Sequence, residues 1–163
     1  RDLHSFPTRR SSDLCTGHNI PRSILKSDIF VFQTQKPGAD GHATLMSSWL
    51  IYAKANNHLL MSTQLLLYDY WKKSNQLIDY FLFHHFFTIA SSRFPLEAAK
   101  IPPFCNTVPH ILLLHFFDKY DEDLFEDLKN MTCFHKLSYK FTEEDMDKKG
   151  TFYDVIINGS IQD

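Results

Sequence analysis

Two groups of polar side chains in this sequence could do chemistry. Asp79 lies in the string LIDYF, where its neighbours are mostly apolar, so a carboxylate stands out there. Such a group can take a proton from a hydroxyl and act as a general base. His135 lies in the string FHKLSYK, which also carries Lys136 and Lys140. A neutral imidazole is a good metal ligand, and two ammonium groups can balance the charge of a phosphate.

Both groups also have a purely structural interpretation. Asp79 could face solvent on an aromatic-rich helix, and His135 could lie partly buried in a strand with both lysines in water. The strings at 121–123 (DED) and 145–147 (DMD) have the form of an Asp-x-Asp metal motif, but their acidic, lysine-flanked surroundings favour a solvated helix face. The cysteines and the paired histidines at 84–85 match no zinc pattern.

Five further residues are candidates for contacts with a sugar. The indole of Trp49 could pack on a pyranose ring with Ser48 beside it, although core packing is the commoner role of a tryptophan at helical spacing. Tyr80 carries the same ambiguity. Asp40 and His42 lie in a glycine-bounded loop, which could be a substrate loop or a plain connection.

The pattern of apolar residues predicts a mostly helical chain with a few short strands. Aromatic and β-branched residues predict a strand at Ile29–Gln33. Apolar spacings of three and four predict three consecutive helices between residues 44 and 90, the first of them holding the string MSSWLIYA. Breaks are expected at Asn56-Asn57 and Ser74-Asn75. Four prolines then predict an extended loop at 94–110.

The last third of the chain should combine short helices with short strands. Apolar spacing predicts a helix at 121–130, and the apolar run at 111–117 is a helix or a strand, of which we favour the helix. A capping box predicts a short helix after Thr142. Alternating patterns predict strands at Phe134–Lys140 and Thr151–Ile157.

Composition narrows the class of protein. A chain of 163 residues allows one domain with a moderate core, and 44% hydrophobic with 22% charged residues is globular composition. A net charge of −2 and a pI near 6.5 exclude a basic nucleic-acid binder. The longest apolar runs are far too short to span a membrane. Three widely spaced cysteines fit reduced thiols better than a disulfide framework.

The first residues stand apart from the rest. Arg1–Leu14 contains the string HSFPTRRSSDL, which resembles one reading frame of a sequencing adapter translated by accident. We therefore set residues 1–14 aside as artefactual and expect a single domain part at 15–163, with natural sequence upstream of Cys15 missing. The alternative is a natural basic, serine-rich arm.

Several motifs between Thr16 and Lys140 resemble, in their order, the capsular polysaccharide synthesis family of bacterial glycosyltransferases. The strings are MSSWLIYAKANNHLLMSTQLLLYDYWKKSNQLIDYFLFHHFF, NTVPHILLL and FHKLSYK. The resemblance implies an α/β fold, the glycosyltransferase A-type sandwich, of which this chain would hold a mostly helical C-terminal part. It also implies transfer of a sugar from a nucleotide-sugar donor to a capsular or other surface polysaccharide, or to its lipid-linked precursor.

The resemblance also assigns roles to individual residues. Asp79 would be the catalytic carboxylate, and His135 would complete the shell of a Mn²⁺ or Mg²⁺ ion that neutralises the donor diphosphate. The residues expected to contact substrate are Ser48, Trp49, Asp40, His42, Tyr80, Lys136 and Lys140. The family's Asp-x-Asp motif would precede Cys15 and is absent from this sequence, so we expect the chain to be inactive alone.

The alternative function is a helical module that docks to a partner protein or a membrane surface without chemistry. Tyr70–Lys73 would then be an interfacial anchor. A transferase predicts that Asp79 and His135 meet at one cleft, whereas a docking module leaves them unrelated. Scattered histidines alone would suggest a metal-dependent hydrolase. We expect a cytoplasmic protein, in peripheral contact with the inner face of the plasma membrane, because no signal peptide is visible and nucleotide sugars are supplied there.

Overall fold

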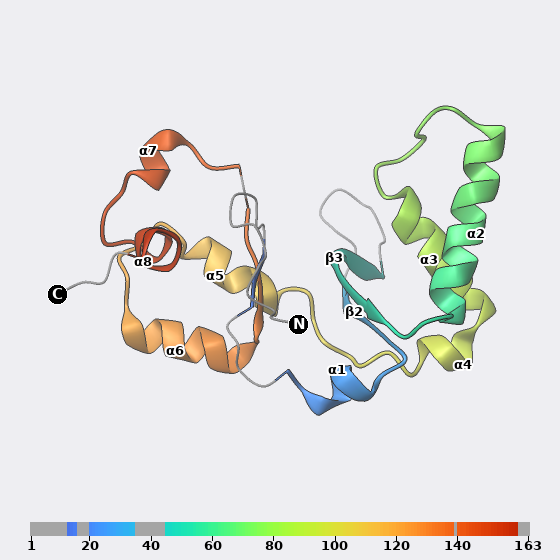
Figure 1. Ribbon diagram of the computed structural model, residues 1–163, viewed down its shortest axis with the longest axis horizontal. Coiled ribbons are helices and arrows are strands. Elements are labelled where there is room, and N and C mark those ends of the chain that lie inside the picture. Colours follow the sequence, from blue (N-terminus) through green and yellow to red (C-terminus); the bar gives the residue numbers. More distant parts are fainter. Residues whose placement is uncertain (1–12, 16–19, 35–44, 139, 160–163) are drawn as a thin grey trace. The chain divides into compact units, whose positions relative to one another are not determined.

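The chain divides into two compact units. In the computed structural model, residues 13–15, 20–34, 45–138 and 140–159 are described. We call Pro21–Asn106 the central unit, and Arg1–Ile20 together with Thr107–Asp163 the terminal unit. Both units combine helices with one small antiparallel sheet, which confirms the mixed, mostly helical fold class (Figure 1).

The sheet of the central unit pairs β2 (Ile29–Gln33) with β3 (Met46–Ala53). The predicted strand is confirmed at the predicted bounds. Ile29 pairs with Ala53, whereas Gln33 pairs with Met46, so the register shifts along the ladder. The extra residues on β3 change which face the following side chains occupy.

The helix predicted for the string MSSWLIYA is wrong, because these residues form β3. Met46, Ile51 and Ala53 all pack on the same hydrophobic cluster, although a regular strand would place Met46 on the opposite face from the other two. The irregular register brings all three to one side, and the seven-residue separation of Met46 and Ala53 that results also suits one face of a helix. Pairing with β2, together with the content of aromatic and β-branched residues, favours a strand over a helix at these positions.

Helices α2 (His58–Lys73) and α3 (Leu82–Arg93) pack against each other and confirm the second and third predicted helices. The side chain of Asn57 caps α2 by accepting a hydrogen bond of 3.2 Å from the Leu60 amide. Together with β2 and β3 these helices enclose the core of the central unit. Its buried members are Ile29, Val31, Met46, Leu59, Phe87 and Ile101.

The other face of β2 is covered by aromatic rings. Phe32 stacks on Trp49 with ring centroids 5.0 Å apart, and Phe30 meets Phe104 edge to face at 5.5 Å. Because both faces are covered, β2 is a continuous apolar run and not an alternating one. The short helix α1 (Arg22–Lys26) precedes this strand.

The predicted loop at 94–110 is wrong in part. Two short helices lie within it, α4 (Pro95–Ala98) and the 3₁₀ helix η1 (Val108–His110). Each has a proline in its first turn, where the missing N–H costs nothing. These prolines therefore begin helices here.

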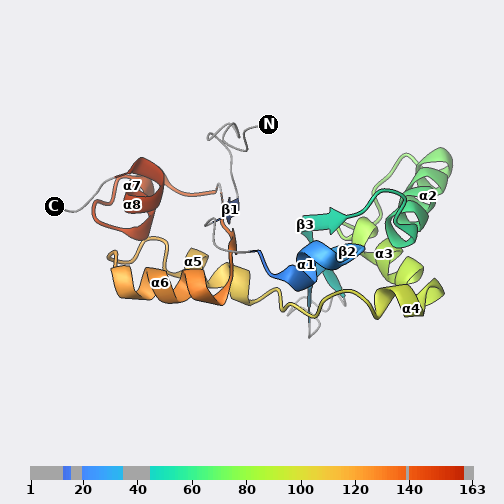
Figure 2. The same ribbon diagram turned by 60° about the horizontal axis from the view of Figure 1, so that its bottom comes forward.

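The terminal unit pairs β1 (Asp13–Cys15) with β4 (Phe134–Lys136), and Leu14 lies opposite His135 (Figure 2). Strand β4 is shorter than the predicted Phe134–Lys140. The helices of this unit are α5 (Ile111–Leu114), α6 (Glu122–Met131), α7 (Glu143–Met146) and α8 (Phe152–Asn158). The helices predicted at 121–130 and after Thr142 are thereby confirmed, and the helix predicted at 111–117 is confirmed only for its first four residues.

Aromatic rings dominate the core of the terminal unit. Phe116 and Phe152 are almost fully buried. Phe116, Phe117, Phe141 and Tyr153 lie in mutual contact, with the closest pair of ring centroids, Phe117 and Phe141, 4.9 Å apart. Many of the phenylalanine side chains in the sequence therefore lie in two packed clusters, one in each unit.

The strand predicted at Thr151–Ile157 is wrong, because α8 lies there. Thr151 caps this helix by accepting a hydrogen bond from the Asp154 amide, and Gly159 ends it with a left-handed φ of 68°. These two end signals outweigh the alternation in the string TFYDVII. Within the described ranges, no helix is long and apolar enough to cross a membrane.

Candidate functional site

A pocket of about 430 Å³ opens in the central unit, between β3 and the start of α3. Ser48 and Ile51 line it from β3, and Tyr80, Phe83 and His84 line it from the other side. Ser48 and Tyr80 are two of the residues predicted to contact substrate. The pocket therefore offers two hydroxyl groups, one imidazole and an apolar wall.

Asp79 lies directly before the pocket residue Tyr80 and is held by two hydrogen bonds. Its Oδ1 accepts from the Phe81 amide at 2.6 Å, and its Oδ2 lies 3.2 Å from Nε2 of His85. The bond from the Phe81 amide closes a short turn before α3 begins at Leu82, and Asp79 itself is not the cap residue of that helix. The Asp79 and His85 side chains are 27% and 40% exposed, so both are reachable from solvent.

The hydrogen-bonded Asp79–His85 pair is the arrangement in the central unit best suited to acid–base chemistry. When Nε2 of His85 carries the proton that faces Asp79, Nδ1 is left as a hydrogen-bond acceptor. A carboxylate that orients an imidazole in this way can serve as a proton acceptor. Sequence reasoning named Asp79 and missed His85, since a separation of six residues is no regular helical contact and becomes close only through the turn before α3.

His84 presents a neutral imidazole at the pocket. Burial lowers the pKa of this residue below its ordinary value of 6.5, and the neighbouring charge of His85 lowers it further, against smaller opposite effects of the Phe81 backbone and Asp79. Its Nδ1 atom is buried, and it finds no hydrogen-bond partner in the described part of the chain. Because Nδ1 is buried, this atom does not face a ligand in the pocket and is an unsatisfied polar group of the described structure.

Trp49 has contacts that match the core-packing alternative. Its Nε1 donates to Oδ1 of Asn106 at 3.0 Å, and its ring stacks on Phe32. Its role in substrate contact stays a prediction. Asp40 and His42 lie outside the described residues.

In the terminal unit, His135 is 1% exposed. Both of its ring nitrogens are buried and have no hydrogen-bond partner among the described residues. Burial lowers the pKa of His135 to about 4, so the ring is neutral at pH 7. Lys136 is half-buried in the same strand and Lys140 is exposed beyond it. Since Asp79 and His135 belong to different units, their meeting at one cleft stays a prediction.

A divalent cation does not find a complete ligand set in the described residues. Within those ranges no three histidine, cysteine, aspartate or glutamate side chains are grouped so that they could hold a metal. His135 has orphaned nitrogens, but Mg²⁺ and Mn²⁺ prefer several oxygen ligands. The two acidic strings have structural roles instead: Asp121 caps α6, and Asp145 pairs with Lys148 at 2.7 Å.

A second pocket of about 290 Å³ lies where β3 leads into α2. Its charged side chains are largely paired: Lys54 contacts Asp28 at 2.7 Å, and His58 contacts Glu97 at 2.9 Å. Lys100 also lines it. Exposed pairs of this kind contribute little to stability.

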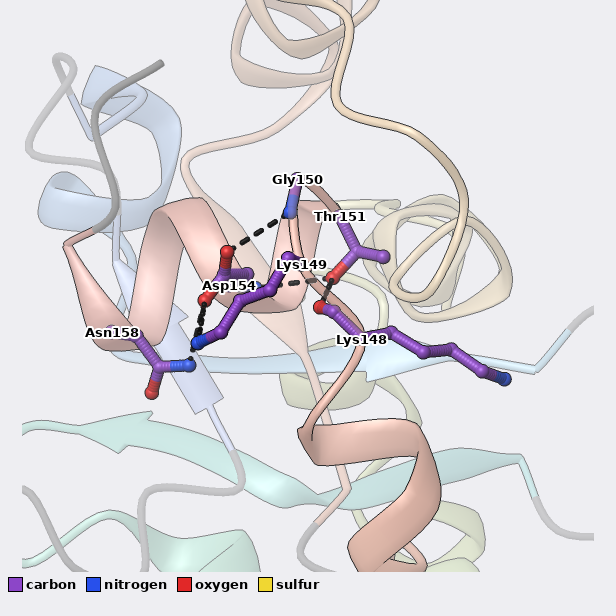
Figure 3. A network of polar contacts seen from close by, with 6 residues as sticks. All are labelled: Lys148, Lys149, Gly150, Thr151, Asp154 and Asn158. Carbon is purple, nitrogen blue, oxygen red and sulfur yellow. Dashed lines mark hydrogen bonds and ion pairs between the residues drawn. The ribbon is translucent and has the colours of Figure 1, made fainter. Parts of the chain in front are cut away.

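Sequence reasoning also missed a buried carboxylate, Asp154 (Figure 3). Its Oδ1 accepts from Nζ of Lys149 at 3.2 Å and from Nδ2 of Asn158 at 3.0 Å, and its Oδ2 accepts from the Gly150 amide at 2.9 Å. Thr151 donates in turn to the Lys148 carbonyl at 3.1 Å. The signal was present in the string GTFYD, where a threonine precedes an acid by three residues. Because these bonds use both oxygens of the carboxylate, Asp154 holds the start of α8 and is no candidate for catalysis.

The comparison with protein families agrees with this chain's motifs. A family model described as capsular polysaccharide synthesis protein matches residues 11–156. Comparison with curated proteins and with solved structures finds no match. The family match begins within the segment 1–14, and β1 includes the last two residues of that segment. Since the match covers most of its length, the chain belongs to the capsular polysaccharide synthesis protein family.

Proposed function

We propose that this chain serves in the transfer of a sugar from a nucleotide-sugar donor to a surface polysaccharide or its lipid-linked precursor, and that the pocket beside β3 holds a sugar. One observation carries the proposal. The hydroxyl-bearing Ser48 and Tyr80 line one pocket, and the Asp79–His85 pair directly adjoins the lining residues Tyr80 and His84 in the chain.

The lining of the pocket suits a pyranose. A sugar ring presents hydroxyl groups at its edge and C–H groups on its faces, so it needs both hydrogen-bonding groups and an apolar or aromatic wall. Ser48 and His84 supply the former, Phe83 and Ile51 supply the latter, and Tyr80 can supply both. Tyr80 is 84% exposed, so the pocket is an open depression in which a bound sugar would keep one face in solvent.

The Asp79–His85 pair would take the proton of the acceptor hydroxyl. In the proposed step, the acceptor oxygen bonds to the anomeric carbon while the bond from that carbon to the donor diphosphate breaks. The hydroxyl proton passes to the pair, and the electron pair of the broken bond leaves with the diphosphate. Two hydrogen bonds fix Asp79 before substrate arrives, which lowers the entropic cost of reaching the reactive geometry.

The donor side is proposed for the terminal unit. Lys136 and Lys140 would balance the charge of the diphosphate. A Mn²⁺ or Mg²⁺ ion belongs to the proposal for the complete reaction, with His135 as one ligand, and the described residues lack a full ligand set for it. We place the reaction at the cytoplasmic face of the membrane, where nucleotide sugars are supplied.

A saccharide titration tests the sugar pocket. The ¹⁵N-labelled chain is titrated with methyl α-glucopyranoside, methyl α-galactopyranoside and maltotriose, and amide shifts are followed by NMR. We expect the shifts to cluster at Ser48, Ile51, Tyr80 and His84, with Tyr80→Ala weakening binding about tenfold through loss of a ring contact and a hydrogen bond. Tyr68→Ala removes an exposed tyrosine from α2 and should bind like the natural chain.

Two results would contradict the proposal. One is a set of shifts that lies away from the pocket. The other is equal affinity of the Tyr80→Ala and Tyr68→Ala variants for every saccharide that binds.

A further inference from the structure

We propose that Asn158 is a deamidation site that the hydrogen bonds around Asp154 hold unreactive, and that its conversion to aspartate or isoaspartate releases the end of α8. This modification site lies in the terminal unit, and the inference does not rest on the proposed sugar pocket. Because the ammonia that is lost does not return, each conversion leaves a permanent change in the chain.

The sequence places the reacting groups side by side. Asn158 is the single asparagine of this sequence that a glycine follows. Gly159 has no Cβ, so its backbone nitrogen can approach the side-chain amide carbon of Asn158 and its dihedral angles can change freely. Both residues are exposed, so water reaches them. This pair is therefore the asparagine site in the chain with the highest intrinsic reactivity.

The reaction needs water as its only co-reactant. The backbone nitrogen of Gly159 bonds to Cγ of Asn158, and the bond from Cγ to Nδ2 breaks. The electron pair of the broken bond leaves with Nδ2, which takes the proton of the Gly159 amide and departs as ammonia. Water then opens the cyclic imide at one of its two carbonyl carbons, which gives aspartate or isoaspartate.

In the folded chain, Asp154 holds both reacting groups. The Gly159 amide donates to the backbone carbonyl of Asp154 where the helix ends. Nδ2 of Asn158 donates to Oδ1 of Asp154 at 3.0 Å (Figure 3). The attacking nitrogen and the leaving group are thus both engaged in hydrogen bonds that must open before the imide can form. The rate of deamidation therefore follows the opening of this helix end.

The end of α8 can open without unfolding the terminal unit. Phe152, at the start of the helix, is buried in the aromatic core, and Ile156 packs against that core. Ile157 is 45% exposed, and Asn158 and Gly159 after it are exposed as well. A segment with few buried contacts opens at low free energy. The contacts to Asp154 therefore hold this end of the helix closed.

The product of the reaction cannot restore these contacts. An aspartate at position 158 has no N–H group to donate, and it brings a second carboxylate beside Oδ1 of Asp154. Two carboxylates four residues apart on a helix repel each other. Lys149, whose Nζ lies 3.2 Å from Oδ1 of Asp154, offsets part of this repulsion. Isoaspartate adds a carbon atom to the backbone and interrupts the helix. Either product therefore favours the open end.

Peptide mapping by mass spectrometry tests the inference on the full chain at pH 8. We expect deamidation of Asn158 to be at least tenfold faster in urea than in the folded natural chain. The folded Asp154→Ala variant should react at least fivefold faster than the natural chain. Asn130, an exposed asparagine of α6 that a methionine follows, is measured in the same digests and should react slowly in every sample.

Matched variants separate the helix end from general instability. Leu128→Ala weakens the core of the same unit at a residue that is 2% exposed, but it leaves the Asp154 contacts in place, so deamidation should stay as slow as in the natural chain. Gly159→Ala, added to Asp154→Ala, should slow the reaction at least tenfold because the new methyl group hinders ring closure. A Cβ at position 159 meets nothing within 4 Å, although the φ of 68° disfavours alanine.

The effect of the modification is measured on the variant that carries its product. Asn158→Asp should lower the midpoint of thermal unfolding relative to Asn130→Asp, which places the same charge at an exposed position of α6. This comparison and the comparison in urea do not depend on whether Asp154→Ala folds.

Three results would overturn the proposal. One is an equal rate at Asn158 in the folded and the urea-unfolded natural chain. Another is a folded Asp154→Ala variant that reacts no faster than the natural chain or Leu128→Ala. The last is an equal midpoint of unfolding in Asn158→Asp and Asn130→Asp.

Discussion

Two carboxylates of this chain, one in each unit, have opposite surroundings. In the terminal unit, Asp154 is buried and its oxygens are used by Lys149, Gly150 and Asn158. In the central unit, Asp79 is partly exposed and its Oδ2 lies 3.2 Å from Nε2 of His85. A buried, saturated carboxylate holds a fold together, whereas a reachable one beside a pocket can meet a ligand. The difference gives Asp154 a structural role and Asp79 a role in recognition.

His135 is the exception to this division. It is as buried as the structural groups of the terminal unit, yet its ring nitrogens have no hydrogen-bond partners among the described residues. An unsatisfied buried polar group costs stability, and native proteins keep few of them. The free-energy cost of these unsatisfied nitrogens must be offset either by a bound ligand or by the packing around the ring. The variants below distinguish the two.

The aromatic core should give the largest effect. Phe116→Ala removes a ring that is 1% exposed and is expected to lower the free energy of unfolding by about 4 kcal/mol through lost burial and a cavity. Leu114→Ala, at a site 77% exposed in the same unit, should change it by less than about 0.5 kcal/mol. Urea unfolding measures both, and a similar small effect of the two changes would contradict the core assignment.

Acid should weaken the terminal unit through His135. The pKa of this residue is about 4 in the folded chain and about 6.5 when unfolded, so the folded state binds fewer protons between these values. Stability from this group is complete above pH 6.5 and declines as the pH falls toward 4, by about 2.5 kcal/mol at pH 4.5. Unfolding of the natural chain and of His135→Phe is compared at pH 7.5 and 4.5.

The His135→Phe variant should lose this part of the acid sensitivity, because phenylalanine has no proton to gain. An equal decline in both proteins would show that other groups cause the acid sensitivity. A variant that is much less stable at pH 7.5 would show instead that the imidazole is satisfied by a group outside the described residues.

Loss of the Asp154 network should come next. Asp154→Ala leaves the Gly150 amide and the Asn158 side chain without their acceptor, at an expected cost of about 2 kcal/mol in unfolding free energy. Asp127→Ala removes an exposed carboxylate from α6 and serves as the control. Thermal unfolding followed by circular dichroism compares them, and equal midpoints would remove the structural role assigned to Asp154.

Asp79 should matter least for stability. Asp79→Ala loses the bond from the Phe81 amide in the turn before α3 and should cost about 1 kcal/mol. Denaturant unfolding against Asp69→Ala, an exposed carboxylate of α2, measures it. A cost as large as that of Asp154→Ala would mean that Asp79 is chiefly structural, and the contrast between the two carboxylates would fail.

Elements could be predicted where a helix cap, apolar spacing or composition within the segment itself determines the structure. The helix α6 follows from its cap at Asp121 and its apolar spacing, and β2 follows from its composition. The string of β3 was misassigned because a register shift in a two-stranded sheet is a tertiary feature. The cap and final glycine of α8 were present in the sequence, but alternation was given more weight than they were.

The site was predictable only in part for a similar reason. Asp79, Ser48 and Tyr80 were named from the motifs, and Ser48 and Tyr80 lie in one pocket. The partner His85 depends on a turn whose geometry no spacing rule contains. The hydrogen bonds that the Asp154 oxygens accept likewise depend on the path of the backbone around Gly150.

One measurement tests the contrast between the two carboxylates most directly. The saccharide affinity of Asp79→Asn and of Asp154→Asn is determined by NMR titration, with the unfolding free energy of each measured in parallel. We predict that Asp79→Asn binds at least tenfold more weakly at nearly unchanged stability, since it loses a charged acceptor. Asp154→Asn should bind like the natural chain while being less stable. Unchanged affinity in Asp79→Asn, or lost affinity in a folded Asp154→Asn, would contradict the account.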